Sequence, residues 1–210
     1  MKLYDFSLAP NPRRVRMFIA EKGIEVPTVQ INTREAEQFS EEFIKINPRS
    51  TVPALQLDDG TVLTESVSIC RYFEETHPEP PLMGRTATEK AVIDMWNRRA
   101  EIEFYLPAAD VVRNSLDMFK DRGLPGMRSG VPQIPALAER GRATFARFIE
   151  RTDAHLANNR FLAGDGFSIA DMTTFITADF AKRGELEIPA QCTNMLRWQS
   201  EIAARPSASA

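Results

Sequence analysis

The chain contains 210 residues, of which 43% are apolar, so it can bury the core of one or two globular domains. Its formal net charge is -3 with acidic and basic residues interleaved, so neither nucleic acid nor a membrane surface is an expected partner. No apolar run approaches the roughly 20 residues that cross a bilayer, and residues 1–10 lack the apolar stretch of a secretory signal. Cys70 and Cys192 form neither a CxxC pair nor a zinc-binding pattern. We therefore expect a cytoplasmic protein without a metal site.

The first part of the chain predicts a mixed α/β unit. A short strand over residues 2–6 precedes a helix, for which Asn11 is the expected N-cap and Pro12 the first helical residue. A second strand follows over residues 26–31, and Ser40 is expected to cap a short second helix.

Two further strands form the expected hairpin of this unit. They cover residues 53–57 and 61–64, and the Asp59-Gly60 pair between them suits the positive φ of a tight turn. A helix over residues 65–76 completes the order βαβαββα, which implies a mixed sheet with helices on its faces.

From residue 87 onward the pattern is helical. Helices are expected over residues 87–120, 135–158, 169–182 and 193–204. A Pro- and Gly-rich linker precedes them, and a second such stretch between the first two helices predicts a long loop of the kind that borders binding clefts.

Four motifs in this order resemble the cytosolic glutathione transferase family, and the likeness covers essentially the whole chain: NPRSTVPAL, LTESVSICRYFEE, FLAGDGFSIADM and RWQSEIAARP. In the first motif Ser50 stands where the family has glycine. The resemblance implies a thioredoxin-like βαβαββα domain over residues 1–78, followed by an all-helical bundle domain over residues 88–210 that contributes the electrophile site. It also implies a homodimer that takes glutathione as co-substrate.

Pro53 stands where a strand should begin. A cis Val52-Pro53 bond would turn the backbone groups of Val52 outward, where they could pair with a peptide. In the resembling family the cysteinyl backbone of glutathione is held in this way. The alternative is a trans proline that begins an edge strand.

Glu65 and Ser66 open a helix, whose free N–H groups and dipole favour an anion. The resemblance implies that Ser66 donates to the γ-glutamyl carboxylate of glutathione and that Glu65 accepts from its ammonium group. The alternative is simple capping, with Ser66 as N-cap and Glu65 beside it.

Arg13 and Arg14 lie in the first turn of the first helix, where positive charge opposes the dipole. One or both are therefore candidates to bind an anion, such as the glycyl carboxylate of glutathione or an acidic co-substrate. Arg49 and Thr51 are weaker candidates for the same role, and ordinary exposed arginines are the alternative.

Thiol activation is where the sequence departs from the family. A free thiol with a pKa of about 8.5 is only ~3% thiolate at pH 7, so full ionisation gains about 30-fold. Ala9 stands at the position of the family's usual Ser or Cys, and Asp5 at about that of its Tyr. Asn11 is our first candidate for the catalytic residue and Ser7 the second, although Asn11 is also the expected N-cap.

Two further groups of residues are interpreted from their spacing. Ser168 and Asp171 have the spacing of a capping box, so we assign Asp171 to folding rather than to chemistry. The electrophile site is expected on the first helix of the second unit, although the same stripe of side chains is also typical of core packing. Its candidates are Tyr105, Val112, Arg113 and Leu116.

Three functions remain open from the sequence. The first is a glutathione transferase that activates the thiol for attack on an apolar electrophile or a peroxide. The second is a glutathione-dependent disulfide reductase, since some members of the family use Asn or Thr near the thiol. The third is a glutathione-binding regulatory protein with little catalysis, which Ala9 favours.

Overall fold

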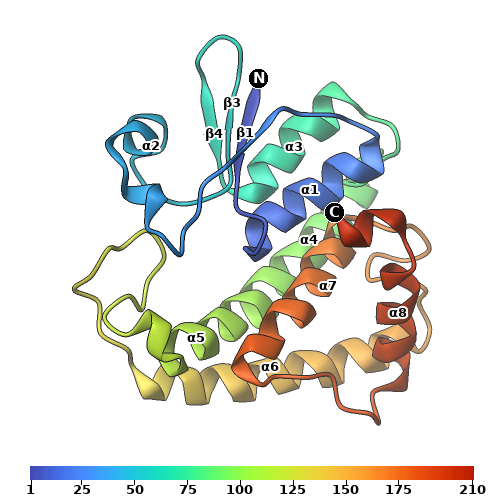
Figure 1. Ribbon diagram of the computed structural model, residues 1–210. Coiled ribbons are helices and arrows are strands. Elements are labelled where there is room, and N and C mark those ends of the chain that lie inside the picture. The colour runs from blue at the N-terminus through green and yellow to red at the C-terminus, as the bar shows by residue number, and fades with distance from the viewer.

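The computed structural model describes all 210 residues. Its sheet has the order β2-β1-β3-β4, in which β1 and β2 are parallel and the other pairs are antiparallel. The elements of this half are β1 (Lys2–Asp5), α1 (Pro10–Lys22), β2 (Thr28–Gln30), α2 (Glu41–Ile46), β3 (Ala54–Gln56), β4 (Val62–Thr64) and α3 (Ser66–Thr76). The predicted order βαβαββα is confirmed (Figure 1).

The alternation of side chains in β1 separates the two faces of the sheet. Leu3 belongs to the large core cluster on the side of α1 and α3, whereas Tyr4 packs with Phe43 of α2 on the other side. The predicted hairpin is also present, because Leu57 N–H donates to the carbonyl of Thr61 over 2.8 Å and Gly60 has a φ of +87°.

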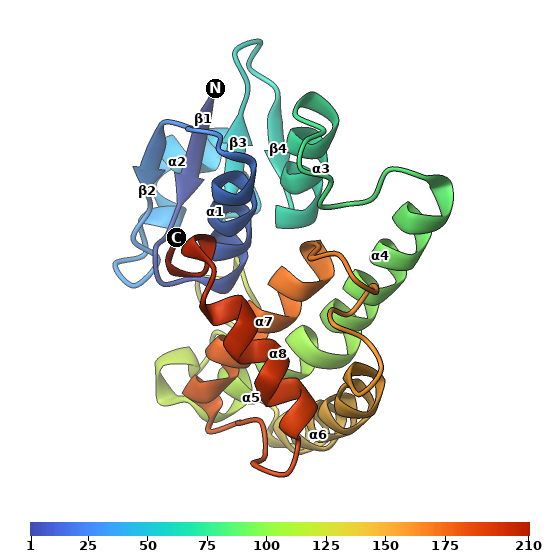
Figure 2. The same cartoon turned by 90° about the vertical axis from the view of Figure 1, so that its right-hand side faces the viewer.

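The remainder of the chain is helical, as predicted, and α7 lies at its centre (Figures 1 and 2). Every residue from Ile169 to Ala178 is buried, because the neighbouring helices surround this segment. The elements are α4 (Ala87–Arg99), the π-helical η2 (Ala100–Tyr105), α5 (Leu106–Ser115), α6 (Pro135–Leu156), α7 (Ile169–Ala181) and α8 (Thr193–Ala203). Short 3-10 turns are η1 (Glu37–Phe39), η3 (Asp117–Phe119), η4 (Lys182–Gly184) and η5 (Pro206–Ser209).

Helix α1 joins the two halves, since it packs against α3 on the sheet side and against α7 and η5 on the helical side (Figure 2). A single cluster of 33 buried residues extends through both halves. The connection between α3 and α4 is fixed by Glu74, whose carboxylate accepts from the N–H groups of Leu82 and Met83 and pairs with Lys22. The domain boundaries at residues 78 and 88 therefore stay a prediction, because the packing is continuous.

Several predicted boundaries are wrong. Helix α1 begins at Pro10, so its N-cap is Ala9 rather than Asn11, and Pro12 is its third residue. Both prolines suit a first turn, and the sequence pattern does not choose between them. The long helix expected to reach residue 120 ends at Ser115, because Leu116 has an extended backbone.

Two other expectations are refined. The second strand is shorter than residues 26–31. Ser40 caps α2 as predicted, since its Oγ accepts from the N–H of Phe43 over 3.2 Å. None of the helices is both long and apolar enough to cross a bilayer.

Candidate functional site

The loop before β3 has the predicted cis Val52-Pro53 bond. Neither the N–H nor the C=O of Val52 has a hydrogen-bond partner in the chain. The loop is held from behind, because the side chain of Asn47 donates to the carbonyl of Thr51 over 2.8 Å. Ser50 is buried with a φ of +52°, which explains why glycine suits this place in the resembling family. The loop thus leaves the N–H and the C=O of Val52 without a partner in the protein.

The start of α3 does not match the alternative in which Ser66 is the N-cap of this helix. Glu65 is the N-cap residue, with a φ of +64° and no capping side chain, and Ser66 is the first residue of the helix. Glu65 is 71% exposed and lies 3.9 Å from the Nε of Arg49. A side chain larger than glycine rarely adopts this backbone without a compensating role, and the N–H groups at the start of α3 stay available to an anion.

Arg14 lies buried beneath Ser66. One terminal nitrogen, Nη1, donates to the Oγ of Ser66 over 2.9 Å and to Glu101 Oε1 over 3.1 Å. Its Nε is buried without a partner. Because Glu101 offsets the charge of this guanidinium, its main effect at the start of α3 is to use the Ser66 oxygen as an acceptor, so that the hydroxyl proton points away from Arg14.

The side chain of Arg13 points in a different direction from that of Arg14, although the sequence alone gives no reason to distinguish the two. Its Nη1 donates to Asp179 Oδ2 over 2.9 Å, and its Nη2 donates to the carbonyl of Ala208 over 2.8 Å. Both terminal nitrogens are therefore used within the protein. The position of Arg13 in the first turn of α1 is explained by its contacts with α7 and η5.

Asn11 and Tyr105 meet between the two halves. The amide Nδ2 of Asn11 donates to the Tyr105 hydroxyl over 3.0 Å. Burial raises the pKa of Tyr105, against the opposing effect of Arg14 and Arg113, so the hydroxyl stays protonated at neutral pH. The π-helical turn of η2 ends at Tyr105, and such turns are frequent at functional sites.

The start of α1 offers few backbone donors. Pro10 and Pro12 have no N–H, and the N–H of Arg13 donates to the carbonyl of Ala9. The N–H of Asn11 has no backbone acceptor and lies at the positive end of the helix dipole. Asn11 thus carries both a free backbone donor and a side-chain amide at the same point.

Ser7, the second candidate, lies in the exposed loop between β1 and α1. Its N–H donates to Gln30 Oε1 over 3.0 Å, and its carbonyl accepts from Arg16 over 2.9 Å. These contacts fix the backbone of Ser7 and leave its hydroxyl without a partner in the protein. Its catalytic role stays a prediction.

The four electrophile-site candidates do not share one environment. Val112 is 1% exposed and packs beneath Gly184, so it belongs to the core. Arg113 Nη1 donates to the carbonyl of Arg122, and burial lowers the pKa of Arg113. Leu116 is half-buried just beyond α5. Of the four, only Tyr105 contacts a predicted catalytic residue.

Asp171 is structural, as expected. Its Oδ2 accepts from both the N–H and the Oγ of Ser168 over 3.0 Å. Its Oδ1 accepts from Leu162 N–H over 3.0 Å and from the Nε1 of Trp198 over 2.9 Å. Because this carboxylate is fully buried and used by four donors, it joins α7 to α8 and takes no part in the candidate site.

Comparisons with known proteins agree with this geometry. Residues 9–76 match the family model of the glutathione S-transferase N-terminal domain, and residues 123–206 match that of the C-terminal domain. The chain is 33% identical to glutathione S-transferase 2 of Saccharomyces cerevisiae, over 99% of this chain and 87% of that protein. The chain belongs to the glutathione S-transferase family.

Solved structures of this family superpose closely on the chain. A glutathione S-transferase domain-containing protein of Marinobacter aquaeolei VT8 has a TM-score of 0.91 at 32% identity, covering 99% of both chains. Gtt2 of Saccharomyces cerevisiae has a TM-score of 0.89 at 32% identity, covering 99% of this chain and 98% of its own. The predicted thioredoxin-like and helical fold of a glutathione transferase is thereby confirmed.

Sequence reasoning missed two features of this transferase. Glu101 was not singled out, although it accepts from the buried Arg14. The contact between Asn11 and Tyr105 was also missed, since 94 residues separate them. The sequence held one indication that Arg13 and Arg14 have different partners. Adjacent helical residues point about 100° apart, so the two side chains cannot both face one ligand.

Proposed function

We propose that this glutathione transferase binds glutathione and activates its thiol for attack on an apolar electrophile or a peroxide. The observation that carries the proposal is the free backbone of Val52 beside the open start of α3. A γ-glutamyl peptide needs a partner for its cysteinyl backbone and one for its terminal carboxylate. Val52 supplies the first, and Ser66 with the N–H groups of α3 supplies the second.

The charges around α3 fit this peptide head group. Glu65 is exposed and acidic, and it accepts from the γ-glutamyl ammonium group. The hydroxyl of Ser66 accepts from Arg14, which leaves its own proton to be donated to the carboxylate. Thr51 lies beside Val52 in the same loop. Arg13 is not included, because both its terminal nitrogens already have acceptors in the protein.

Thiol activation is assigned to the start of α1. The thiol of bound glutathione lies near Asn11, whose N–H and amide stabilise the sulfur anion together with the helix dipole. In a conjugation, the thiolate sulfur forms a bond to the electrophilic carbon while the bond to the leaving group breaks. No hydroxyl of the protein is needed at Ala9 for this step, although one would increase the thiolate fraction.

A second candidate function is glutathione-dependent disulfide reduction. It is favoured by Asn11, which places an amide rather than a hydroxyl near the thiol position. A third is glutathione binding with little catalysis, which Ala9 favours. We also propose a cytoplasmic homodimer with a detoxification role. An exposed apolar stripe along α4, η2 and α5 supports the dimer, since Met95, Ile102 and Leu106 are 39%, 50% and 52% exposed.

A panel of three substrates with glutathione tests these functions: chlorodinitrobenzene, cumene hydroperoxide and a mixed disulfide of glutathione. We expect turnover of the first two. Turnover of the disulfide alone would identify a reductase. Binding of glutathione by calorimetry without any turnover would identify a binding protein.

A further inference from the structure

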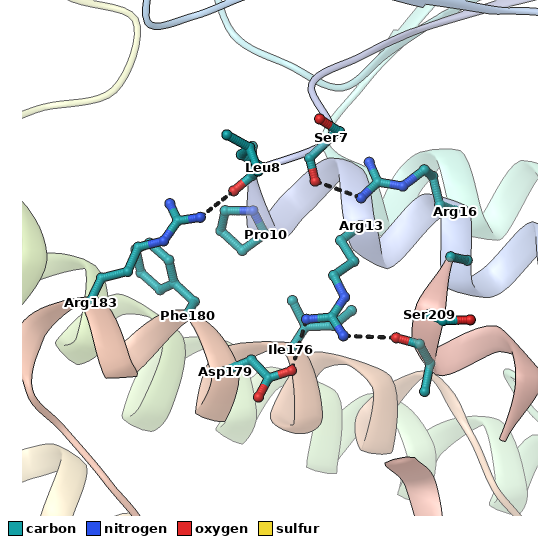
Figure 3. A pocket seen from close by; sticks show the side chains of 13 residues that line it. Ser7, Leu8, Pro10, Arg13, Arg16, Ile176, Asp179, Phe180, Arg183 and Ser209 are labelled. Atoms are coloured by element: carbon teal, nitrogen blue, oxygen red, sulfur yellow. Dashed lines mark hydrogen bonds and ion pairs between the residues drawn. The ribbon is translucent and has the colours of Figure 1, made fainter. Parts of the chain in front are cut away.

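A cavity of about 310 Å³ lies between the loop after β1, the end of α7 and the last residues of the chain (Figure 3). Ala9 and Pro10 form part of its wall, so it borders the start of α1, where the proposed thiol lies. Its apolar surfaces come from Leu8, Phe180 and Ile176. This volume is near the lower end of ligand sites and suits one small aromatic ring.

Three arginines line this cavity, and two of them are paired with carboxylates of the protein. Arg13 pairs with Asp179, and Arg16 pairs with Asp5 over 2.6 Å and donates to the carbonyl of Ser7. Asp179 is itself shared between Arg13 and Lys182. The acidic side chain that lines the cavity, Asp179, is therefore already paired.

Arg183 is the exception. Its Nη2 donates to the carbonyl of Leu8 over 2.7 Å, and its guanidinium lies 5.7 Å from the ring centre of Phe180, but it forms no ion pair. Figure 3 shows it at one end of the cavity, beside Phe180 and opposite Pro10. Burial and the positive charge of Arg34 both lower the pKa of Arg183. Arg183 is exposed at the edge of the cavity, and a cation there without a counter-ion in the protein attracts an anion.

We propose that this cavity binds the electrophilic co-substrate and that Arg183 selects small aromatic electrophiles that carry a carboxylate. The ring packs between Leu8 and Phe180, the carboxylate pairs with the guanidinium of Arg183, and the reactive carbon faces the start of α1. With a chloro-nitrobenzoate, the glutathione sulfur forms the bond to the ring carbon, chloride leaves with the bonding electron pair, and no oxidant or reductant is needed.

The test compares a charged and a neutral electrophile that differ by one methyl group, and it measures conjugation because this inference rests on the proposed conjugation activity. The pair is 4-chloro-3-nitrobenzoate and its methyl ester, each with saturating glutathione. Each kcat/KM is divided by the rate constant of the uncatalysed reaction with glutathione, because the ester withdraws more electron density from the ring and is intrinsically the more reactive electrophile. On this scale the wild-type protein is expected to prefer the acid. Arg183→Gln should lower kcat/KM for the acid about tenfold more than for the ester, the usual size for losing a charged hydrogen bond. Arg183→Lys should retain part of the preference.

Arg147→Gln on the exposed face of α6 is the matched control for loss of one positive charge, and it should keep the wild-type ratio. A second measurement does not depend on catalysis: calorimetry with 3-nitrobenzoate and methyl 3-nitrobenzoate, which have no leaving group. Arg183→Gln should weaken binding of the acid selectively. Equal ratios in wild type and Arg183→Gln, or equal binding of the two probes, would overturn the inference. Absence of turnover with both electrophiles, while the acid still binds through Arg183, would instead contradict the proposed function.

Discussion

The side-chain amide of Asn11 donates a hydrogen bond to the hydroxyl of Tyr105 over 3.0 Å and so connects the start of α1 to the end of η2. This bond uses one of the two N–H groups of the amide, and the other remains available to the sulfur of a bound thiol. The catalytic candidate is thereby held in one orientation by a residue of the helical half.

Replacement of Asn11 by alanine tests this assignment. We expect Asn11→Ala to raise the pKa of bound glutathione and to lower conjugation at pH 7, by at most the ~30-fold that ionisation can supply. Because Ala9 rather than Asn11 is the N-cap, the variant should not lose helix capping. Ultraviolet absorbance of the thiolate, titrated against pH, measures the change. If Ser7→Ala moved this pKa and Asn11→Ala did not, Ser7 would be the activating residue.

Ser66 offers a test of the peptide head-group site. Ser66→Ala should weaken glutathione binding by about 1.5–3 kcal/mol, the usual size for a hydrogen bond to a charged group. Calorimetry measures the affinity, and melting temperature shows whether loss of the acceptor for Arg14 disturbs the fold. Ser68→Ala is the matched control, since Ser68 is exposed on the same helix. Equal affinities of Ser66→Ala and Ser68→Ala would remove Ser66 from the site.

The contacts of Glu21 with Arg205 and Ser207 near the end of the chain predict that the stability of the fold depends on pH. Burial raises the pKa of Glu21, but hydrogen bonds from Arg205 and Ser207 outweigh this, so its pKa is lower than usual. A carboxylate with a lowered folded-state pKa stabilises the fold above its unfolded pKa of about 4.3, and this stability is lost as pH falls through the folded pKa.

Glu21→Gln should therefore melt below the wild type at pH 7, and the difference should shrink as pH falls below roughly 4. Thermal unfolding monitored by circular dichroism over this range is the measurement. Glu25→Gln serves as the control, because Glu25 is exposed and forms no ion pair. A difference in melting temperature between Glu21→Gln and wild type that does not change with pH would show that Glu21 acts through packing rather than charge.

The proposed dimer makes a separate prediction. Ile102→Glu places a charge in the middle of the exposed apolar stripe, so it should shift the protein from dimer to monomer. Sedimentation velocity at several protein concentrations measures this. Glu139→Gln on α6 is the control outside the stripe and should stay dimeric. A wild-type protein that sediments as a monomer at every concentration would contradict the dimer.

Local chemistry made much of the fold predictable. Asp59-Gly60 indicated the hairpin, Ser40 indicated the start of α2, and the Val52-Pro53 pair indicated the cis bond once the family likeness was considered. Each of these depends on a few neighbouring residues, for which turn and cap preferences are strong.

The site was less predictable, since it depends on tertiary contacts. Arg13 and Arg14 are equivalent in the sequence, yet one pairs with α7 and the other lies beneath α3. The contact of Asn11 with Tyr105 forms only when the two halves pack, and Tyr105 lies at the end of a π-helical segment that the sequence pattern does not indicate. Capping also misled the sequence interpretation, because the strained backbone of Glu65 has no signature in residue type.

The position of Ala9 allows a gain of function to be predicted. Its backbone is extended, with φ of -93° and ψ of 141°, which serine adopts without strain. A hydroxyl there reaches the sulfur position at the start of α1, so Ala9→Ser should lower the pKa of bound glutathione and raise conjugation at neutral pH by less than ~30-fold. The new side chain can cap α1 only through the N–H of Asn11, because Pro12 has none. Any gain in the free energy of unfolding should therefore be at the low end of ~0.5–2 kcal/mol. Thiolate titration separates the two effects, since capping alone leaves the thiol pKa unchanged. Ala9→Thr is the companion variant, with the same hydroxyl and an added methyl group. If neither variant lowered the thiol pKa, the sulfur of bound glutathione would not lie at the start of α1.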